Sequence, residues 1–478
     1  MRDIAAAHAD VEEALYVSEQ IDDHVGHANA LLVRGSIEEK DGDLAAAVAS
    51  FEAAEQEFTV AGDRKGNAEA LRLRGLTEMF AGNNDGARRA ISAALDAFGA
   101  LGDSRGQAWA LQNLAWMSYL SGRPSEADRR IDESLQKFGE IGDSSGLGWA
   151  LALRGWVRFH QGRWEEAEAI SEPILADAAG RSDRWAEGMM LLLTASIRLW
   201  SGRAGDAIER AKAALETFKS INDIDREVQA AAILGRAHLA TGAVGEGFRT
   251  LDLAIDLGKG LTGNGATLGP TVAAAAAVAV GDPERALRAV ALVSLDGLDP
   301  SVVGESDRLV ALGLALAQMG RVEDALIHLE HAVSPGPEEA PSGYALSALA
   351  CAQALVGNRA EVERLHAEVV GADRATYSDK VVALLACASS RLGAGEAEAA
   401  NEAFDLAEAI ADGTDDRVSQ AVVRLARAAA GDAAGCPDPV SHAEAMARLT
   451  ELGIGADGWR RLFRGAAQAA GTTMSGTV

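Results

Sequence analysis

The chain has 478 residues, of which 48% are hydrophobic and only 5% aromatic, and it carries a formal net charge of −27. Proline is scarce, and the abundance of alanine favours closely packed helices over strands. The negative charge repels phosphate backbones and anionic lipids, so we expect neither direct nucleic-acid binding nor membrane binding. The same charge keeps an apolar-rich chain soluble and is compatible with a basic partner.

The sequence indicates neither a membrane anchor nor a disulfide framework. The chain begins without an apolar signal segment, and its most apolar run, from Thr271 to Val280, is too short to span a bilayer. The three cysteines, Cys351, Cys387 and Cys436, lie far apart and match no zinc-binding spacing. We therefore expect a cytoplasmic protein whose cysteines are small buried hydrophobic residues.

A period of 40 residues runs through the first half of the chain. Aspartates recur at this spacing, and glycines follow them at the same spacing. The aspartates are Asp23, Asp63, Asp103, Asp143, Asp183 and Asp223, and the glycines are Gly42, Gly82, Gly122, Gly162, Gly202 and Gly242. A fixed period of this length is typical of a stacked array of equivalent helical or strand-based units.

Each repeat predicts two helices. A glycine such as Gly62 ends one helix because it adopts the left-handed conformation at little cost, and the following Asp63 caps the next helix by accepting from free backbone N–H groups. A helix of about 17 residues follows, then a turn at 81–84 and a second helix of similar length. Apolar or small residues recur at intervals of three and four, as at Leu71 and Gly75. The repeat is therefore predicted to be an antiparallel helical hairpin.

The hairpins carry a recurring order of small, small, large and small residues. The first three repeats have it as Gly35, Ala47, Phe51 and Ala54, as Gly75, Ala87, Ile91 and Ala94, and as Ala115, Ala127, Ile131 and Ser134. This order resembles the tetratricopeptide repeat, although the period exceeds the usual value of about 34 residues and the family's tryptophan and tyrosine core positions are mostly leucine or polar here. The resemblance covers residues 8–260. It implies an all-α, right-handed superhelical solenoid, with about eleven antiparallel hairpins in the whole chain.

The second half of the chain continues the pattern less regularly. Glycine turns are expected at Gly281, Gly320, Gly357, Gly393 and Gly431, which predict five degenerate hairpins. Two stretches, 258–270 and 334–341, interrupt the array and are candidates for bends, and residues 458–464 predict a last amphipathic helix. The predicted organisation is a regular array at 1–260, divergent repeats at 261–436, capping helices at 437–470 and a disordered tail at 471–478.

Repeats of this kind also resemble the C-terminal arrays of actinobacterial signal-transduction ATPases, which include large LuxR-like activators and antibiotic regulators. The shared pattern includes a G-D-x-x-G turn, as at residues 102–106. In that family the array senses a ligand or partner, while other domains hydrolyse ATP and bind DNA. This chain has no G-x-x-x-x-G-K-[ST] loop and no evident helix-turn-helix. The resemblance therefore implies only the sensing role, in signalling or transcription regulation, for a fragment or a stand-alone relative.

No arrangement of side chains in the sequence indicates catalysis, a cofactor or a bound metal. His328 and His331 lie three residues apart on one expected helix, but no third ligand is apparent in the sequence, so a solvated helix face explains them. His24 and His27 have the same explanation. The glycines of 258–265 lack the phosphate-loop spacing. We expect a protein that is not an enzyme and that needs no cofactor or metal.

Seven of the eight tryptophans fall between residues 109 and 200. Trp109 and Trp116 lie two helical turns apart on one face, and Trp149 and Trp156 take the same places one repeat later. In the tetratricopeptide register these positions face the inner groove, where tryptophan is a favoured anchor for a ligand. Filling of the core between neighbouring repeats explains the same pattern equally well. The other candidate ligand-binding residues on these helices are Asn113, Tyr119, Phe159, Met189 and Trp200.

Arginines recur just before the small residue of the first helix, at Arg34, Arg74 and Arg154. Arg74 and Arg154 join the candidate site because a guanidinium can hold a ligand carboxylate. The alternative, and the commoner role of such residues, is to pair with acidic side chains of a neighbouring helix and thereby lock one repeat to the next.

The sequence therefore predicts a binding module whose concave groove takes a peptide, a protein segment or a small apolar ligand. The alternative is a constitutive assembly scaffold without a small ligand, for example a homodimer formed through the helix that carries Trp459. Complete burial of the four tryptophans would remove the main support for the groove site.

Overall fold

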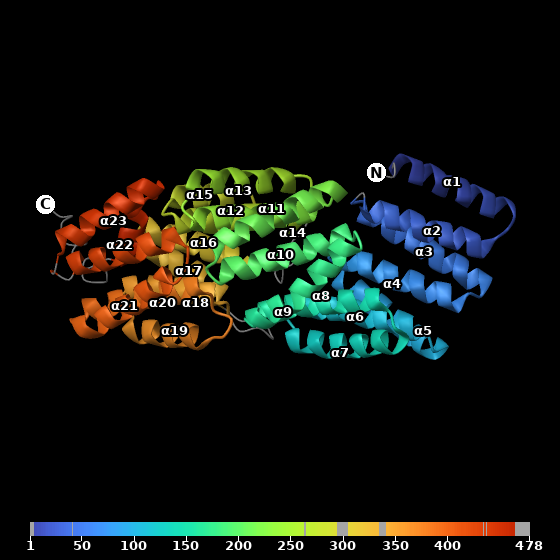
Figure 1. Cartoon of the computed structure of the whole chain (residues 1–478), viewed down its shortest axis with the longest axis horizontal. Helices are drawn as coiled ribbons and strands as arrows, with labels where there is room; N and C mark the ends of the chain where they lie inside the picture. Colours follow the sequence, from blue (N-terminus) through green and yellow to red (C-terminus); the bar gives the residue numbers. More distant parts are fainter. Residues whose placement is uncertain are drawn as a thin grey trace. The chain divides into compact units, whose positions relative to one another are not determined.

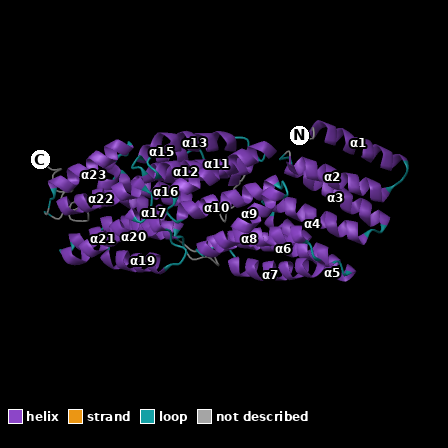
Figure 2. Ribbon diagram, viewed as in Figure 1, coloured by secondary structure: helices purple, strands orange, loops and turns teal. Residues whose placement is uncertain are grey.

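The computed structural model describes residues 4–40, 42–261, 264–293, 305–333, 341–433, 435 and 437–463. These residues form 24 helices and no strand, which confirms the predicted all-α class (Figure 2). None of the helices in these ranges is both long and apolar enough to cross a lipid bilayer. The chain divides into two compact units: an N-terminal unit, Met1–Val157, and a C-terminal unit, Arg158–Val478.

The N-terminal unit consists of helices of nearly equal length (Figure 1). They are α1 (Ile4–Gln20), α2 (His24–Lys40), α3 (Leu44–Ala61), α4 (Arg64–Phe80), α5 (Asn84–Leu101), α6 (Ser104–Leu120), α7 (Pro124–Ile141) and most of α8 (Ser144–His160). Each has 17 or 18 residues, as predicted. Helices α2 and α3, α4 and α5, and α6 and α7 pack as hairpins, at the places predicted for the first three repeats.

Glycines and aspartates form the turns between hairpins in the predicted way. Gly62 and Gly102 follow α3 and α5 with φ of 72° and 68°, in the left-handed region. The Asp103 carboxylate then accepts from the N–H of Gly106 at 3.0 Å and caps α6. Later in the array, Asn222 takes the glycine place with φ of 57°, since asparagine tolerates this conformation better than most residues.

Other glycines make room for a large side chain on the adjacent helix. A Cβ atom added at Gly106 would stand 2.2 Å from the Phe98 ring, and one added at Gly75 would stand 2.6 Å from Ile91. Both distances are far shorter than van der Waals contact, and the two large side chains are fully buried. Gly75 and Ile91 join the two helices of one hairpin, whereas Phe98 and Gly106 join one hairpin to the next. The small and large residues that recur in the sequence are thus the residues that pack against each other between the helices.

Gly106→Ala is expected to destabilise the protein by about 1–3 kcal/mol, because the added methyl overpacks a site that the Phe98 ring already fills. The measurement is thermal or urea unfolding followed by circular dichroism. Gly99→Ala is the matched control, since Gly99 lies in α5 with no heavy atom within 4 Å of an added Cβ. It should stabilise the helix by about 0.5–1 kcal/mol. Equal effects of the two changes would contradict the packing role of Gly106.

The cap aspartates also bind a side chain of the preceding repeat. One carboxylate oxygen caps the helix that follows, and the other accepts from a donor 38 residues earlier in the chain. The pairs are Lys65 Nζ with Asp103 at 2.8 Å, Arg105 Nε with Asp143 at 3.0 Å, and Trp185 Nε1 with Asp223 at 3.1 Å. A single side chain therefore fixes both the start of a helix and the position of that helix relative to the previous hairpin.

Asp103→Asn is expected to weaken the dependence of the free energy of unfolding on pH at acid pH. Burial of Asp103 raises its pKa, but the Gly106 N–H and the Lys65 ammonium lower it further, so the folded pKa lies below the ordinary value. The carboxylate therefore stabilises the fold above about pH 4, and this contribution is lost as the pH falls through the depressed folded pKa. Wild type should be more stable than the variant at neutral pH, and this difference should shrink as the pH falls below about 4, so the variant should lose less stability in that range than wild type does. Asp96→Asn, at an exposed site of α5, serves as the control, and an identical profile for both variants would refute the prediction.

The C-terminal unit is also built of helical hairpins, and its helices vary more in length (Figure 1). They are α9 (Trp164–Gly180), α10 (Arg184–Trp200), α11 (Ala204–Ile221), α12 (Ile224–Ala240), α13 (Val244–Gly258), α14 (Asn264–Ala279), α15 (Pro283–Val290), α16 (Glu305–Gln318), α17 (Val322–Ala332), α18 (Gly343–Leu355), α19 (Arg359–Gly371), α20 (Tyr377–Gly393), α21 (Ala397–Asp412), α22 (Arg417–Ala433), α23 (Pro439–Leu452) and α24 (Ala456–Phe463). Five helix pairs, from α14–α15 to α22–α23, occupy the region where five degenerate hairpins were predicted.

Two of the five turns predicted there are wrong. Gly393 is the last residue of α20, and Gly431 lies inside α22. The left-handed glycines near them are Gly395 and Gly435, with φ of 83° and 77°. The helices run past the predicted glycines because a glycine in a helix costs only about 1 kcal/mol, which favourable packing easily offsets.

Some predictions concern residues outside the described ranges. They include most of the proline-containing stretch 334–341, Cys436 and the tail 471–478. The predicted amphipathic helix at 458–464 corresponds to α24, which ends at Phe463. The division between the two compact units falls at Val157, inside the predicted regular array, and the boundary at residue 260 stays a prediction.

Segments near the end of the C-terminal unit contact segments near its beginning. The loop before α22 contacts the α10–α11 turn: the Asp415 carboxylate accepts from the N–H groups of Ala204 and Gly205 at 2.6 and 2.7 Å, and the Asp415 N–H donates to the Gly202 carbonyl at 3.0 Å. The N-cap residue of α11 makes no side-chain cap of its own. A residue about 210 positions later therefore caps this helix, and it ties the end of the unit to its beginning.

Helix α24 makes a second closing contact within this unit. The Trp459 Nε1–H donates to the Ala279 carbonyl at 3.2 Å, and the Gly455 N–H donates to the Val280 carbonyl at 3.0 Å. Trp459 and Phe463 are buried, with their rings stacked. A dimer formed through α24 would therefore have to use side chains other than Trp459.

Candidate functional site

The four tryptophans of the candidate site lie on two neighbouring helices of the N-terminal unit. Trp109 and Trp116 belong to α6, and Trp149 and Trp156 belong to α8. The helices are in contact, because Trp109 packs with Ala150 of α8 in one apolar cluster and Trp116 packs beside α8 in another. The structure therefore brings the two tryptophan pairs onto helices that pack in shared apolar clusters.

All four indoles are half-buried. Trp109 contacts Phe138 edge to face, with ring centroids 5.1 Å apart and an interplanar angle of 75°. Phe138 itself is fully buried, as are Phe58 and Phe98 at the equivalent places of earlier repeats. The phenylalanines thus fill the core between hairpins, and each tryptophan divides its surface between that core and solvent.

Polar side chains lie directly beside the aromatic face. Asn113 is buried, and with its amide oriented to satisfy both neighbours it donates to the Trp109 carbonyl at 3.1 Å and accepts from Arg72 Nη1 at 3.3 Å. Arg72 Nε in turn donates to Glu69 at 2.9 Å, within α4. The amide of Asn113 on α6 is therefore linked, next to the tryptophans, to a cation and a carboxylate on α4 of the preceding hairpin.

The remaining aromatic candidates divide between the two units. Tyr119 is half-buried beside the α6–α7 cluster, and burial raises the pKa of its hydroxyl. Phe159 and Met189 are buried, and they belong with Trp200 to the C-terminal unit. The Trp200 ring carries the Arg236 guanidinium at 4.0 Å from its centroid, a cation–π contact. The structure thus brings together Trp109, Asn113, Trp116, Tyr119, Trp149 and Trp156 in one unit.

Arg74 forms three ion pairs with acidic side chains. Its Nε donates to Glu55 of α3 at 2.6 Å, and its Nη1 lies 3.2 Å from Glu78 and 3.8 Å from Glu52. Burial raises the pKa of Glu55 even though Arg74 lowers it. Arg154 likewise pairs with Asp132 of the preceding helix, α7. Both arginines therefore have the contacts expected for locking one repeat to the next.

Two hollows border Arg74. One, of about 280 Å³, lies between α4 and α5, and the other, of about 470 Å³, lies between α3 and α4. Glu52 and Glu55 line the larger hollow beside Arg74, whereas the smaller hollow is lined by Glu78 and by two arginines, Arg74 and Arg89. A ligand carboxylate would meet these acids, so the surroundings of Arg74 favour the structural role over ligand binding.

Arg74→Ala is expected to cost about 2 kcal/mol of stability, because it leaves Glu55 and Glu78 partly buried without their partner. Unfolding by urea measures the effect. Arg89→Ala, at an exposed side chain on the rim of the smaller hollow, should change stability by no more than about 0.5 kcal/mol. If Arg74→Ala were neutral, the locking role would be excluded and a ligand role would regain support.

The other residues considered from the sequence have ordinary surroundings. Cys351 and Cys387 are fully buried, as predicted, and burial raises the pKa of each thiol to about 12. His331 is exposed and His328 is half-exposed on α17. His24 forms a hydrogen bond with Glu57 at 2.7 Å, and this contact raises the pKa of His24.

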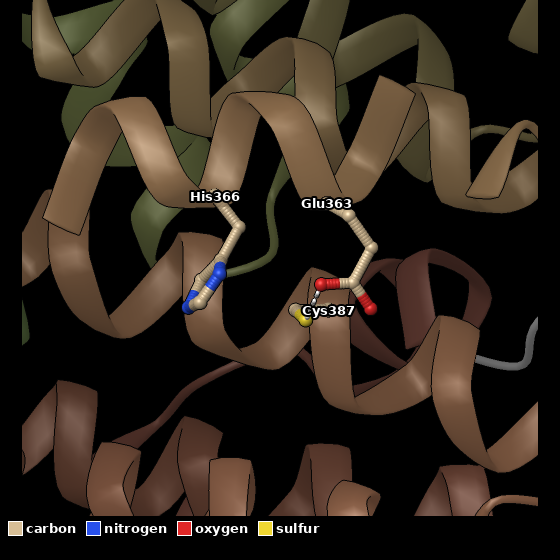
Figure 3. A group of neighbouring side chains, drawn as sticks. All are labelled: Glu363, His366 and Cys387. Carbon is tan, nitrogen blue, oxygen red and sulfur yellow. Dashed lines mark hydrogen bonds between the residues drawn. The ribbon is translucent and has the colours of Figure 1, made fainter. Parts of the chain in front are cut away.

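Sequence reasoning missed two groups of polar residues in the C-terminal unit. One surrounds Arg236: Asp307, Tyr344 and Asp379 come from three other helices and act on its charge. Asp307 is exposed to solvent, yet the protein around it raises its pKa by desolvation, as expected for a side chain on the wall of a concave space. The second group is Glu363, His366 and Cys387 (Figure 3). Neither has a sequence motif, since helix packing alone brings the residues together.

These features define a helical-repeat protein with the architecture of a tetratricopeptide-like solenoid. No protein-family model matches the sequence, and no curated protein is significantly similar to it. Among solved structures, a Rap protein complexed with Competence and Sporulation Factor is 12% identical, with a TM-score of 0.53 over 73% of this chain and 98% of that chain. The apo form of the quorum sensor NprR from B. thuringiensis is 12% identical, with a TM-score of 0.47 over 73% and 99% of the two chains. The Cut9–Hcn1 hetero-tetramer of the APC/C matches at 14% identity, with a TM-score of 0.46 over 93% and 94%. Identities this low show the fold alone.

Proposed function

We propose that the protein is a non-catalytic binding module that takes a peptide or protein segment onto the aromatic face of α6 and α8. The observation that carries this proposal is the half-burial of Trp109, Trp116, Trp149 and Trp156 beside fully buried phenylalanines. Indoles that share their surface with solvent are strong anchors, because a ligand gains free energy by covering them. A small apolar ligand remains an alternative occupant of the same face.

The polar residues beside the panel favour a peptide over a purely apolar ligand. Arg72 and Asn113 place a cation and an amide next to Trp109; they already bond to each other and to Glu69, so an extended segment would exchange one of these contacts for its own backbone groups. The net charge of −27 favours a basic segment. In the C-terminal unit, by contrast, the contacts of Asp415 and Trp459 already join the end of the unit to its beginning, which leaves the N-terminal unit as the better place for a partner.

The comparison with solved structures supports this proposal at the level of the fold. One matched structure with a TM-score above 0.5 is a Rap protein complexed with Competence and Sporulation Factor, so the architecture is compatible with holding a second molecule. A sensing role in signalling or transcription regulation, as the resemblance to actinobacterial regulators implies, is part of the proposal.

A constitutive assembly scaffold is the second candidate function. It is favoured by exposed apolar side chains near the end of α1 and just after it, which are Tyr16, Val17 and Ile21. Several large exposed apolar residues close together in the chain suit a protein–protein contact. This function predicts a stable complex or oligomer that does not depend on the tryptophans.

Trp116→Ala combined with Trp156→Ala is expected to weaken binding of a basic peptide pool by roughly tenfold or more, as for central anchor residues. Fluorescence anisotropy of the labelled pool measures binding, and circular dichroism checks that helicity is retained. Trp185→Ala is the matched control, since Trp185 is also half-buried but lies outside the panel and bonds to Asp223.

Three outcomes separate the two functions. Lost binding with retained helicity supports the panel. Unchanged binding in a folded double variant rejects it, and sedimentation of an oligomer that the tryptophan changes leave intact would favour the scaffold. If the alanine variant unfolds, Trp116→Phe with Trp156→Phe repeats the test with the packing largely kept.

A further inference from the structure

Three side chains of types that bind transition metals converge between two consecutive hairpins of the C-terminal unit. Glu363 and His366 project from one face of α19, three residues apart, and Cys387 lies on α20 (Figure 3). One potential ligand atom from each residue lies within 4.8 Å of the other two. A metal ion with ordinary bond lengths of about 2.0–2.3 Å would need these atoms only slightly closer together.

The environment of the cluster suits an ion that enters from solvent and is then held. Cys387 is fully buried, whereas Glu363 and His366 remain partly accessible. The Sγ of Cys387 lies 3.6 Å from Glu363 Oε2. His366 Nε2 is buried, and none of the described residues gives it a hydrogen bond. The imidazole therefore carries a polar atom that helix packing alone does not satisfy.

We propose that Glu363, His366 and Cys387 form a zinc site that joins α19 to α20, with water as the fourth ligand. One thiolate, one imidazole and one carboxylate are a donor set typical of Zn²⁺, while magnesium and calcium require oxygen ligands. The site is independent of the tryptophan panel, which lies in the other compact unit.

Arg391 completes the arrangement. Its Nε and Nη2 donate to the two Glu363 oxygens, each at 2.8 Å. This pair holds the carboxylate in place and leaves lone pairs on both oxygens for a metal. An outer-shell donor of this kind orients a ligand in many metal sites. In the zinc-bound site the charges of the thiolate and the carboxylate cancel that of Zn²⁺, so the ion and its ligands carry no net charge and Arg391 adds one positive charge beside them.

The test is a titration of the full chain with Co²⁺, which replaces zinc and reports a bound thiolate through a sulfur-to-cobalt charge-transfer band. Cys436→Ser is present in every protein compared, so that only the two buried cysteines remain. We expect one equivalent of Co²⁺ to give the band and Zn²⁺ to displace it. Cys387→Ala should abolish the band, and His366→Asn should weaken Co²⁺ binding by roughly tenfold or more.

Cys351→Ala is the matched control, because Cys351 is equally buried, on α18, and among the described residues it belongs to no group with a histidine and a carboxylate. Its protein should keep the band. A second readout is thermal unfolding: Zn²⁺ should raise the midpoint of the parent and of Cys351→Ala but not of Cys387→Ala, because ligand binding to the folded state stabilises it. Absence of the band in the parent, or its persistence in Cys387→Ala, would overturn the proposal. Should Cys387→Ala fail to fold, Glu363→Gln and His366→Asn supply the same comparison at accessible side chains.

Discussion

The carboxylate that starts each new hairpin is the interaction on which the array depends. One oxygen of Asp103 accepts from the backbone of α6, and the other pairs with Lys65 from the preceding repeat. Capping is a local effect, whereas the second contact links consecutive repeats. Because Asp103, Asp143 and Asp223 each do both, the starts of α6, α8 and α12 are held to a donor of the preceding repeat. This coupling recurs with the 40-residue period of the sequence.

This coupling also explains how far the sequence could predict the fold. Left-handed glycines and capping aspartates act over four or five residues, so their signal is complete in the sequence. The order of Gly75 and Ile91 is equally local, because it belongs to one hairpin. The turns at Gly395 and Gly435 were misplaced because a helix continues through a glycine when its neighbours are packed. Local chemistry alone does not determine where such a helix ends.

The candidate sites were less predictable, for a physical reason. Periodicity placed Trp109 and Trp149 on adjacent helices, but the extent of their exposure depends on how Phe138 fills the space beside them. The closing contact of Asp415 spans about 210 residues and has no local signature. Glu363 and Cys387 meet only because α19 and α20 pack in one register. Contacts of this kind arise from the assembled array and not from any one repeat.

The pairing of a phenylalanine with a glycine bears on how such an array can lengthen. A tandem duplication of residues 63–102 would place a new Phe98 against the Gly106 that follows, and the original Phe98 against a new Gly66, so every junction is regenerated. The fourth repeat lacks this property, since Ala178 stands where the ring would be and Ala186 where the glycine would be. A copy of the second repeat inserted after Ser182 would leave an empty volume beside Ala178 and would crowd the copied Phe98 against Ala186. A repeat can therefore be added among the early repeats without repacking of side chains, whereas a repeat added after the fourth requires repacking at the new junctions.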